Sequence, residues 1–425
     1  MTIGSTHAIN GETPRWENSG GASNHNEIAP RMADSEDNTI VLSFKYRLLP
    51  SRKQHMALEQ MLEDQRILYN AALEERISYY RHIGKSRTYM DQCKALTELR
   101  QDGEFSSVPA NIQRWTLKRL DAAYQAFFRR VKSKGQKAGF PRFRGKGWWH
   151  SFGFNEFSGI TIKRNRLYFK RMPAGLRVYL HRTLPEGKPL SCTFTRDTKG
   201  WAVCVQYRLP VTHVVDTGNQ VGVDVGLSHL ATLSTAEAIP NPRVAKRAER
   251  EMRRRQRALA RCKRGSKRRR KIRDAVTRCH ARIKNTRRTY LHQVSCRIVR
   301  ENDLIAVEKL NVKGLAGGML AKSVHDAGWS ILKEMLTYKA AKAGRQLIEV
   351  DPRNTTQGCS GCGVIVPKKL SERWHSCPHC GLKLNRDHNA ALNVLHRAVL
   401  RPRLLNAAQW SERATRNIAL PARAK

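Results

Sequence analysis

Two Cys-x-x-Cys pairs near the C-terminal end constrain the fold of this chain more than any other feature of its sequence. The pairs are Cys359 with Cys362 and Cys377 with Cys380, and each is followed by a glycine. Four thiolates at such spacing are typical of a closed, tetrahedral zinc site. We therefore predict a zinc ribbon over 351–386 that binds one structural Zn²⁺. A redox-active dithiol pair is the alternative.

The other cysteines and the nearby histidines are not expected to bind metal. Thiols scattered through a cytosolic chain stay reduced, so six of them are predicted to be small core residues: Cys93, Cys192, Cys204, Cys262, Cys279 and Cys296. Three histidines are expected to be exposed rather than ligands: His375, His379 and His388.

The excess of basic residues indicates a polyanionic partner. The chain has 79 Lys and Arg against 35 Asp and Glu, which gives a formal net charge of +44 at pH 7. Charge of this size repels itself in a folded protein unless phosphate neutralises it, so we expect the chain to bind nucleic acid. A merely solvated basic surface is the alternative. A membrane surface fits less well, because the basic residues are not gathered on one amphipathic helix.

The ends of the chain and its apolar content indicate where it works. No apolar stretch approaches the roughly 20 residues of a membrane helix, and the N-terminus lacks the pattern of a secretory signal. We expect a cytoplasmic, prokaryotic protein associated with the nucleoid. Residues 1–38 are polar and rich in Gly, Asn and Ser, which predicts a disordered tail, and 401–425 form a basic tail.

The first half of the chain contains a strand pattern and then two helix patterns. Residues 39–50 predict a strand that ends at Pro50, after which Ser51 and Gln54 form a capping box for a helix. A second amphipathic helix follows Pro109, and its apolar stripe comprises Leu120, Tyr124, Phe127 and Val131.

The hydrophobic period changes from helix to strand between about 140 and 210. GITIKRNRLYFK predicts two strands around an Asn-containing turn, and a second hairpin is expected to turn near Asp197–Gly200. We therefore predict one β-rich module, a barrel being one form that it could take, which begins near 39, admits the helices as an insertion and resumes near 140.

Two basic segments are candidates for nucleic-acid binding. In GFPRFRGKGWWHSFGF, cations alternate with flat rings, a combination that suits RNA, although an aromatic cluster with solvated arginines explains the same residues. In 240–300, predicted to be two helices broken at Gly265, like charges repel unless phosphate lies among them, and a plain exposed face is the alternative. The candidates are Arg142, Arg144, Lys146, Trp148, Arg253, Arg254, Arg255, Lys267, Arg268, Arg269, Arg270 and Lys271.

Three acidic residues stand where their carboxylates could share one site. Asp224 lies in an apolar strand pattern, and a buried carboxylate must be paired, hydrogen-bonded or bound to metal. Glu308 follows an apolar strand, and Asp387 begins a helix, where the helix dipole alone would favour it. Hard oxygen ligands select Mg²⁺ or Mn²⁺. We predict that these three catalytic residues bind two such ions for phosphodiester hydrolysis.

The order of these motifs resembles a known family of nucleases. GVDVGLSHLATLS, IAVEKLNVKGL, TTQGCSGCG with CPHCG, and NRDHNAALNVL occur in the same order in TnpB, the accessory nuclease of insertion-sequence transposons, also called an OrfB-type transposase, and in the related compact type V CRISPR effectors. The resemblance covers nearly everything from 39 to 400. The N-terminal tail departs from the usual start of the family, so nothing functional is carried onto it.

The resemblance implies a multidomain α/β fold. A β-barrel wedge domain would hold an inserted helical recognition domain, and an RNase H-like RuvC domain would be interrupted by the four-cysteine zinc ribbon. In chain order, the implied parts are the wedge domain at 39–50 and 135–215, the insertion at 51–134, the RuvC domain at 216–350 with its basic segment, the ribbon at 351–386 and the last RuvC helix at 387–400.

The resemblance also implies an enzyme, an RNA-guided DNA endonuclease encoded by a transposon. A guide RNA from the transposon end would pair with double-stranded DNA beside a short motif, and one RuvC site would cut both strands. A compact CRISPR effector, a non-cleaving RNA-guided repressor that has lost acids, and a transposase that joins strands without a guide are the alternatives. A monomer is favoured, but the stoichiometry stays open.

Overall fold

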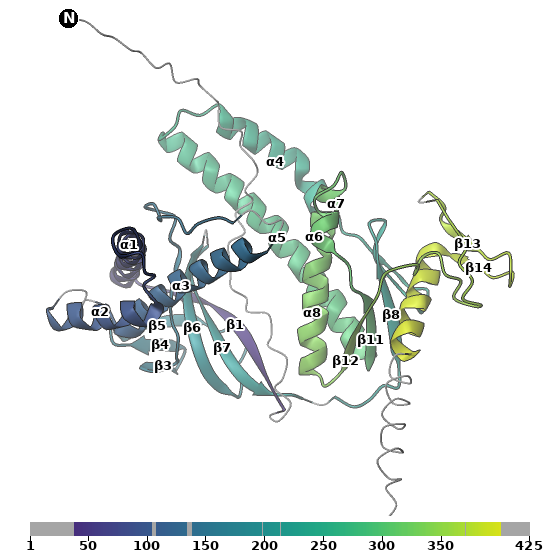
Figure 1. Ribbon diagram of the computed structural model, residues 1–425, viewed down its shortest axis with the longest axis horizontal. Helices are drawn as coiled ribbons and strands as arrows, with labels where there is room; N and C mark the ends of the chain where they lie inside the picture. The colour runs from purple at the N-terminus through teal and green to yellow at the C-terminus, as the bar shows by residue number, and fades with distance from the viewer. Residues whose placement is uncertain are drawn as a thin grey trace, which may run out of the picture.

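Two β-sheets organise the protein, one in each half of the chain (Figure 1). The computed structural model describes residues 38–103, 108–133, 138–197, 199–212, 214–369 and 371–400. The predicted tails at 1–38 and 401–425 lie outside the described residues, apart from Asn38. Within these ranges, no helix combines the length and the apolar character that crossing a membrane requires.

The N-terminal sheet has seven strands paired antiparallel in the order β2-β6-β7-β1-β5-β4-β3. Strand β1 is central, because Thr39–Arg47 pair with β7 and Arg47–Leu49 with β5. The described pairs leave β2 and β3 at the edges, so the closed barrel stays a prediction. The strands are β1 (Thr39–Leu49), β2 (Ser151–Phe154), β3 (Ile160–Lys163), β4 (Arg166–Phe169), β5 (Met172–Tyr179), β6 (Lys188–Asp197) and β7 (Gly200–Pro210).

Both predicted hairpins are present in this sheet. Strands β3 and β4 are joined by Arg164 and Asn165, which adopt positive φ angles of 46° and 60°. These are the backbone angles of a tight hairpin turn. Strands β6 and β7 close the second hairpin, with Asp197 opposite Gly200. Local turn chemistry therefore determined this part of the topology.

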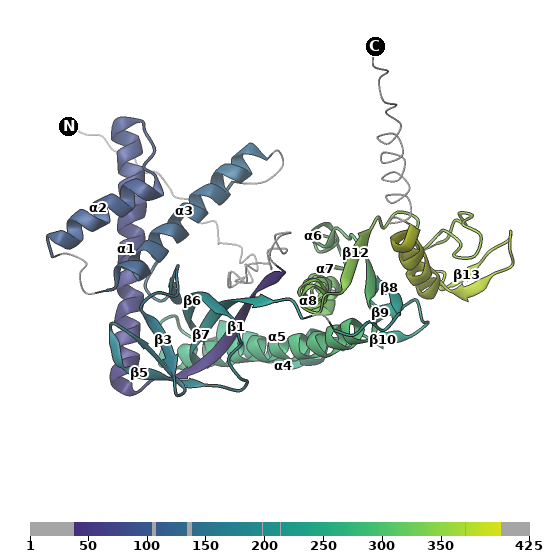
Figure 2. The same cartoon turned by 90° about the horizontal axis from the view of Figure 1, so that it is seen from below.

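Three helices follow β1: α1 (Arg52–Ile83) and α3 (Ala110–Lys132) pack against β2 of the sheet, and α2 (Tyr89–Gln101) packs on α3. The predicted capping box begins α1, since Ser51 Oγ accepts from Gln54 N at 3.3 Å and Gln54 Oε1 accepts from Ser51 N at 3.0 Å. The apolar stripe of α3 is buried as far as Tyr124, but Val131 is 57% exposed. This difference arises because the last turns of α3 extend beyond α1 and β2 (Figure 2).

The second sheet has five strands in the order β10-β9-β8-β11-β12. The first three are antiparallel neighbours, whereas β8, β11 and β12 run parallel. The strands are β8 (Gln220–Val225), β9 (His229–Leu233), β10 (Ala238–Pro240), β11 (Leu304–Glu308) and β12 (Gln346–Val350). The helices between them are α4 (Val244–Ala260), α5 (Lys267–Glu301), α6 (Val312–Leu315), α7 (Ala321–Ala327) and α8 (Trp329–Lys342).

Helices cover both faces of this sheet (Figure 1). On one face α5 and α8 bury a large apolar cluster that includes Leu291, Ile298 and Leu332. On the other face lies a helix over 386–400, whose Val394 and Ala398 pack on the sheet. The zinc-ribbon candidate precedes this helix and contains two short strands, β13 (Trp374–Ser376) and β14 (Lys383–Asn385).

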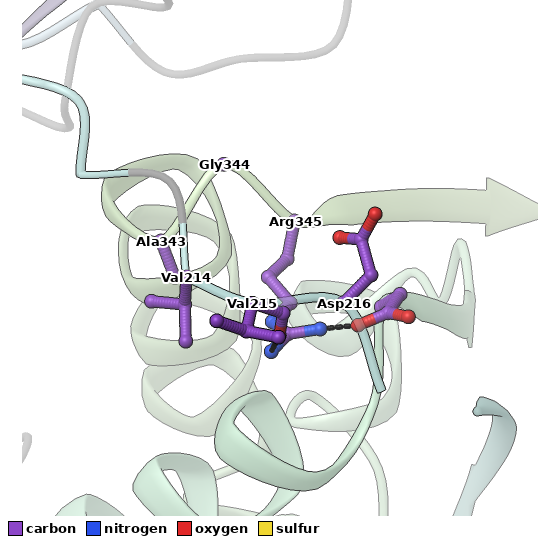
Figure 3. A pocket seen from close by; sticks show the side chains of 7 residues that line it. Val214, Val215, Asp216, Ala343, Gly344 and Arg345 are labelled. Carbon is purple, nitrogen blue, oxygen red and sulfur yellow. Dashed lines mark hydrogen bonds and ion pairs between the residues drawn. The ribbon is translucent and has the colours of Figure 1, made fainter. Parts of the chain in front are cut away.

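The connection between the two sheets is pinned to the second one. Asp303 accepts hydrogen bonds from the backbone N–H groups of Thr217 and Gly218, at 2.8 and 2.6 Å, and is ion-paired with the buried Arg345. Arg345 also donates to Val215 O at 3.1 Å. Asp303 and Arg345 line a cavity of about 340 Å³ together with Val214 and Val215 (Figure 3).

Gly222 on β8 is the point of closest approach between the sheet and the helix over 386–400. A Cβ atom at this position would lie 2.1 Å from Ala391 O and 2.8 Å from Leu395 N. Both are backbone atoms, which cannot move aside as a flexible side chain can. Only glycine therefore permits this helix to pack where it does.

We expect Gly222→Ala to lower the free energy of unfolding by about 1–3 kcal/mol, the usual cost of overpacking. Chemical denaturation of the purified protein measures it. Gly318→Ala is the control, because a Cβ there meets no atom within 4 Å. Equal stability of the two variants would contradict the close contact.

Candidate active site and metal centre

Asp224 and Glu308 occupy equivalent positions on two neighbouring parallel strands. Val223 on β8 is in register with Val307 on β11, so the acid that follows each of them lies at the same edge of the sheet. Asp224 is only 8% exposed, because it lies two residues after Gly222, on the face of the sheet that the helix over 386–400 covers. The sheet therefore brings together the first two predicted acids.

Asp387 reaches the same edge from the helix over 386–400. Its backbone N–H donates to Asn385 Oδ1 at 2.9 Å, which caps the start of the helix, and its Oδ1 accepts from Arg386 Nε at 3.2 Å. The ring of His388 lies 3.1 Å, through Nε2, from Ser234 O at the end of β9. Contacts on both sides of Asp387 thus hold it over the end of β8.

The electrostatics of Asp224 show that the three acids interact. Burial raises the pKa of Asp224 well above its usual range, the charges of Glu308 and Asp387 raise it further, and Arg386 lowers it. Burial also raises the pKa of Glu308, against a hydrogen bond from Thr355 Oγ1 at 2.5 Å and the charge of Arg397. Acids arranged in this way are disfavoured as anions unless cations bind among them. The donor set is of the hard-oxygen kind that suits Mg²⁺ or Mn²⁺.

Two residues that support these acids were not anticipated from the sequence. Thr355 is 2% exposed and holds Glu308, and Arg386 lies beside both Asp387 and Asp224. The sequence contains a pattern that could have indicated Arg386, because this residue directly precedes an acid at a helix start. No sequence pattern indicates Thr355, because its partner Glu308 is 47 residues away in the sequence.

The four predicted zinc ligands form one cluster. Their sulfur atoms lie within 4.8 Å of one another, with 3.6 Å between Cys359 and Cys380 and between Cys362 and Cys377. A tetrahedral Zn²⁺ with Zn–S bonds of about 2.3 Å needs sulfurs about 3.8 Å apart, so the cluster fits this ion. Backbone N–H groups, that of Cys380 first, lower the pKa of Cys377 to about 6, whereas the pKa values of Cys362 and Cys380 are raised within the same cluster.

The two glycines that follow the cysteine pairs explain the shape of this cluster. Gly363 and Gly381 have φ angles of 79° and 72°, and their N–H groups donate to Cys359 O at 2.9 Å and Cys377 O at 3.0 Å. Side chains rarely tolerate such angles, whereas glycine adopts them freely. Each glycine thus lets the chain fold back, so that both thiols of a pair point the same way.

The expectation that the nearby histidines are exposed was wrong for His375. This residue is fully buried, because it faces inward on β13 between the outward-facing Trp374 and Ser376, and its Nδ1 contacts Lys368 Nζ. Burial lowers its pKa. His379 is exposed and His388 is half-buried. None belongs to the cluster of possible metal ligands in the described part of the chain. Of the six scattered cysteines, Cys192 and Cys279 are buried and Cys296 is exposed.

The segment before β2 has an exposed part, which holds all four candidates, and a buried part. Arg142, Arg144, Lys146 and Trp148 are all exposed, Trp148 by 76%. Trp149 is instead buried against Tyr69, at 5.0 Å between ring centroids, with the Arg119 guanidinium 4.3 Å above its ring. The segment therefore combines an aromatic core residue with solvent-facing cations.

The basic segment forms a helical hairpin of α4 and α5 that turns at Gly265, as predicted, with a φ of 83°. Its tip lies away from β8 in both views (Figure 1 and Figure 2). Helix α5 is 35 residues long and packs on α8 only through its C-terminal half.

The eight basic candidates of the hairpin differ in their partners. Arg255 pairs with Glu251 at 2.7 Å, Arg253 with Glu249 at 2.7 Å, and Arg269 donates to Leu259 O at 2.9 Å, which closes the turn. The remaining five are exposed: Arg254, Lys267, Arg268, Arg270 and Lys271.

Three family models match the chain. OrfB_IS605, described as "Probable transposase", matches residues 202–318, and the "Cas12f1-like, TNB domain" matches 329–394. HTH_OrfB_IS605, described as a helix-turn-helix domain, matches 40–85. In that range the structure has strand β1 and the single helix α1.

Several known proteins are similar along much of the chain. A protein of Streptomyces pristinaespiralis, named as an RNA-guided DNA endonuclease, is 34% identical over 364 residues, which cover 83% of this chain and 88% of that protein. InsQ of Escherichia coli K12, named likewise, is 28% identical over 83% of this chain and 91% of its own length. The chain of a solved Cas12f1–sgRNA–target DNA complex shares the fold, with a TM-score of 0.52 at 14% identity over 81% of this chain and 83% of that one.

Replacing Cys359 or Cys380 by Ser is expected to lower the zinc content, measured by elemental analysis, from one ion per chain to a small fraction, because three thiolates bind zinc more weakly than four. The ribbon should also become sensitive to proteolysis, since zinc binding and folding are coupled. Cys296→Ser, at an exposed cysteine outside the ribbon, serves as the control. Full zinc occupancy in either ribbon variant would contradict this ligand set.

Proposed function

This chain belongs to the TnpB family, and on that premise we propose that it is an RNA-guided DNA endonuclease that cuts at one carboxylate site. The observation that carries the proposal is the convergence of Asp224, Glu308 and Asp387, with Asp224 buried and its pKa raised by the other two. The likeness to relatives named as RNA-guided DNA endonucleases supports the guided, DNA-directed activity. All three acids are present, which disfavours a non-cleaving repressor.

The residues of the site have separate roles in hydrolysis. Asp224, Glu308 and Asp387 would hold two Mg²⁺ or Mn²⁺ ions. When bound, such ions would supply Lewis acidity for the attack of water on the scissile phosphate and for the departure of the 3′ oxygen. Thr355 holds the Glu308 carboxylate in one orientation through its 2.5 Å hydrogen bond. Arg386 offsets the repulsion among the acids, since its charge lowers the pKa of Asp224.

The partners are a guide RNA and double-stranded target DNA. The net charge of +44 supports both partners, because a surface with this excess of cations is expected to contact many phosphate groups. Base pairing then reads the target, while the protein reads shape and a short adjacent motif. The exposed cations before β2 and on the α4–α5 hairpin are the proposed phosphate contacts. Sequencing the RNA that co-purifies with the protein tests the guide directly.

We also propose the domain assignment that the family implies. The seven-stranded sheet, together with α1 to α3, would be the wedge domain with its recognition insertion. The five-stranded sheet and its helices would be the RuvC domain, interrupted by a ribbon that binds one structural Zn²⁺. The mixed order β10-β9-β8-β11-β12, with helices on both faces, supports the second assignment.

Asp224→Asn is expected to abolish cleavage of guided target DNA and leave target binding intact, because it removes a metal ligand but changes a charge of +44 by only one. Glu308→Gln and Asp387→Asn should behave in the same way. Gel assays of cleavage and of binding to the same DNA measure both properties. Cleavage near the wild-type rate in any variant would contradict the role of that residue.

The same Asp224→Asn variant should be more stable than wild type when no divalent ion is added. The pKa of Asp224 in the folded state lies above its unfolded value, so the wild type loses stability as the pH rises from the ordinary Asp range through the folded pKa. Asn is uncharged at every pH and carries no such cost. Between pH 4 and 8, the difference in melting temperature between the variant and wild type should therefore widen as the pH rises. If the difference in melting temperature stayed constant over this pH range, the charged form of Asp224 would not be destabilised in the folded protein.

Neutralising the exposed tip of the hairpin should reduce the salt dependence of nucleic-acid binding. A variant with Gln at Lys267, Arg268, Arg270 and Lys271 is expected to flatten the slope of log affinity against log salt by up to about one unit for each phosphate that the variant no longer binds. Different targets should weaken about equally, because phosphate carries no sequence information. An unchanged slope for both guide RNA and target DNA would show that the tip is only a solvated face.

A further inference from the structure

The helix over 386–400 carries a polar stripe that faces the first zinc knuckle. Asn389, Asn393 and Arg397 are spaced by four residues, which places them on one face of a helix. All three bind backbone groups of the single segment 351–360. This segment begins after strand β12 and ends at the first cysteine pair, so the stripe joins the helix to the knuckle along its whole length.

Asn389 makes the contact nearest to the zinc ligands. It is fully buried, its Oδ1 accepts from Ser360 N at 2.9 Å, and its Nδ2 donates to Gly358 O at 2.7 Å. These two backbone groups flank Cys359 on either side. The amide of Asn389 therefore fixes the backbone that carries a zinc ligand, and it does so from a position two residues after Asp387.

Asn393 and Arg397 extend the same attachment along the segment. Asn393 Nδ2 donates to Gly358 O at 2.7 Å and to Thr355 O at 2.8 Å. Arg397 donates to Asp351 O at 2.8 Å and to Arg353 O at 2.6 Å. Asn393 and Arg397 are half-buried, whereas Asn389 is fully buried, and leaving its amide without partners would be costly. The bonds of Asn389 therefore favour one relative position of the helix and the segment.

The segment touches the carboxylate site as well as the zinc site. Thr355 lies within it, has its carbonyl held by Asn393, and donates its hydroxyl to Glu308 at 2.5 Å. The helix that supplies both asparagines also supplies Asp387. Hydrogen bonds thus connect the residues on either side of Cys359 to Thr355 and Glu308, and the helix that makes them also carries Asp387.

We propose that Asn389 and Asn393 are positioning residues, which make the geometry of the carboxylate site depend on the folded first zinc knuckle. This inference rests on the proposed nuclease function. With the knuckle folded, the asparagines fix the position of Thr355 and the start of the helix, and hence Glu308 and Asp387. Loss of zinc, or of either asparagine, frees these acids without disturbing the surfaces that bind nucleic acid.

A purely structural ribbon would behave differently. If the asparagines only attached the ribbon to the nuclease domain, their loss would speed zinc release but leave the acids in place. The affinity of the acids for divalent ions separates the two cases. It can be measured with Mn²⁺ alone by electron paramagnetic resonance, without guide RNA, DNA or cleavage.

The experiment compares Asn389→Ala, Asn393→Ala and the pair Thr355→Val and Thr355→Ser in the full chain. Each asparagine variant is expected to release zinc faster to a chromogenic chelator and to bind Mn²⁺ about ten- to a hundredfold more weakly, the usual effect of residues that orient metal ligands. Thr355→Val should weaken Mn²⁺ binding with zinc release unchanged, and Thr355→Ser, which keeps the hydroxyl, should restore it. His396→Ala, exposed on the same helix, is the control.

Faster zinc release with wild-type Mn²⁺ affinity in both asparagine variants would overturn the proposal, and so would no change in either property. If a variant fails to fold, wild type stripped of zinc replaces it, and unchanged Mn²⁺ affinity in that sample counts against the proposal. Guide-loaded wild type is assayed for target cleavage in parallel. Absence of cleavage there, with the Mn²⁺ result as expected, would count against the proposed function and not against the coupling.

Discussion

The backbone contact between β8 and the helix over 386–400 is the constraint on which the second half of the molecule depends. It exists because residue 222 has no side chain, and it lets the helix lie directly on the strand that carries Asp224. The position of Asp387 follows from it, and so does that of the polar stripe that holds the segment before the zinc ligands. The absence of a side chain at Gly222 thus lets one helix position both the carboxylate site and the segment before the zinc ligands.

Electrostatics give the protein two opposite requirements. Three acids meet at a buried edge of a sheet, where the pKa of Asp224 is raised by burial and because its neighbours repel its charge. The surface meanwhile carries a large excess of cations, many of them exposed on the α4–α5 hairpin. The first requirement is met by small cations and the second by a polyanion. A nucleic-acid substrate with its divalent ions meets both, which is why the site and the surface suit the same ligand.

Sequence patterns predicted what local interactions determine. The capping box at Ser51, the turn at Asn165, the break at Gly265 and the four cysteines all depend on residues close in the chain. Predictions of burial failed where residues distant in the sequence determine it. His375 is buried by the fold of the ribbon, and Val131 is exposed because the last turns of α3 extend beyond the neighbouring elements. Asp224 and Glu308 could be proposed together because strand ends are visible in the local sequence pattern, whereas Thr355 was missed because its contact with Glu308 is not local.

The pinned connection between the sheets determines where the molecule can bend. Asp303 holds Thr217 and Gly218, and further back Thr212 N and Val214 N donate to Lys342 O and Ala343 O, at 3.0 and 3.4 Å. Displacing this connection from the second sheet would have to break these bonds together. Thr212 and the residues from 214 to 218 therefore move with the second sheet, so a change in the angle between the two sheets has to be taken up where the chain leaves β7.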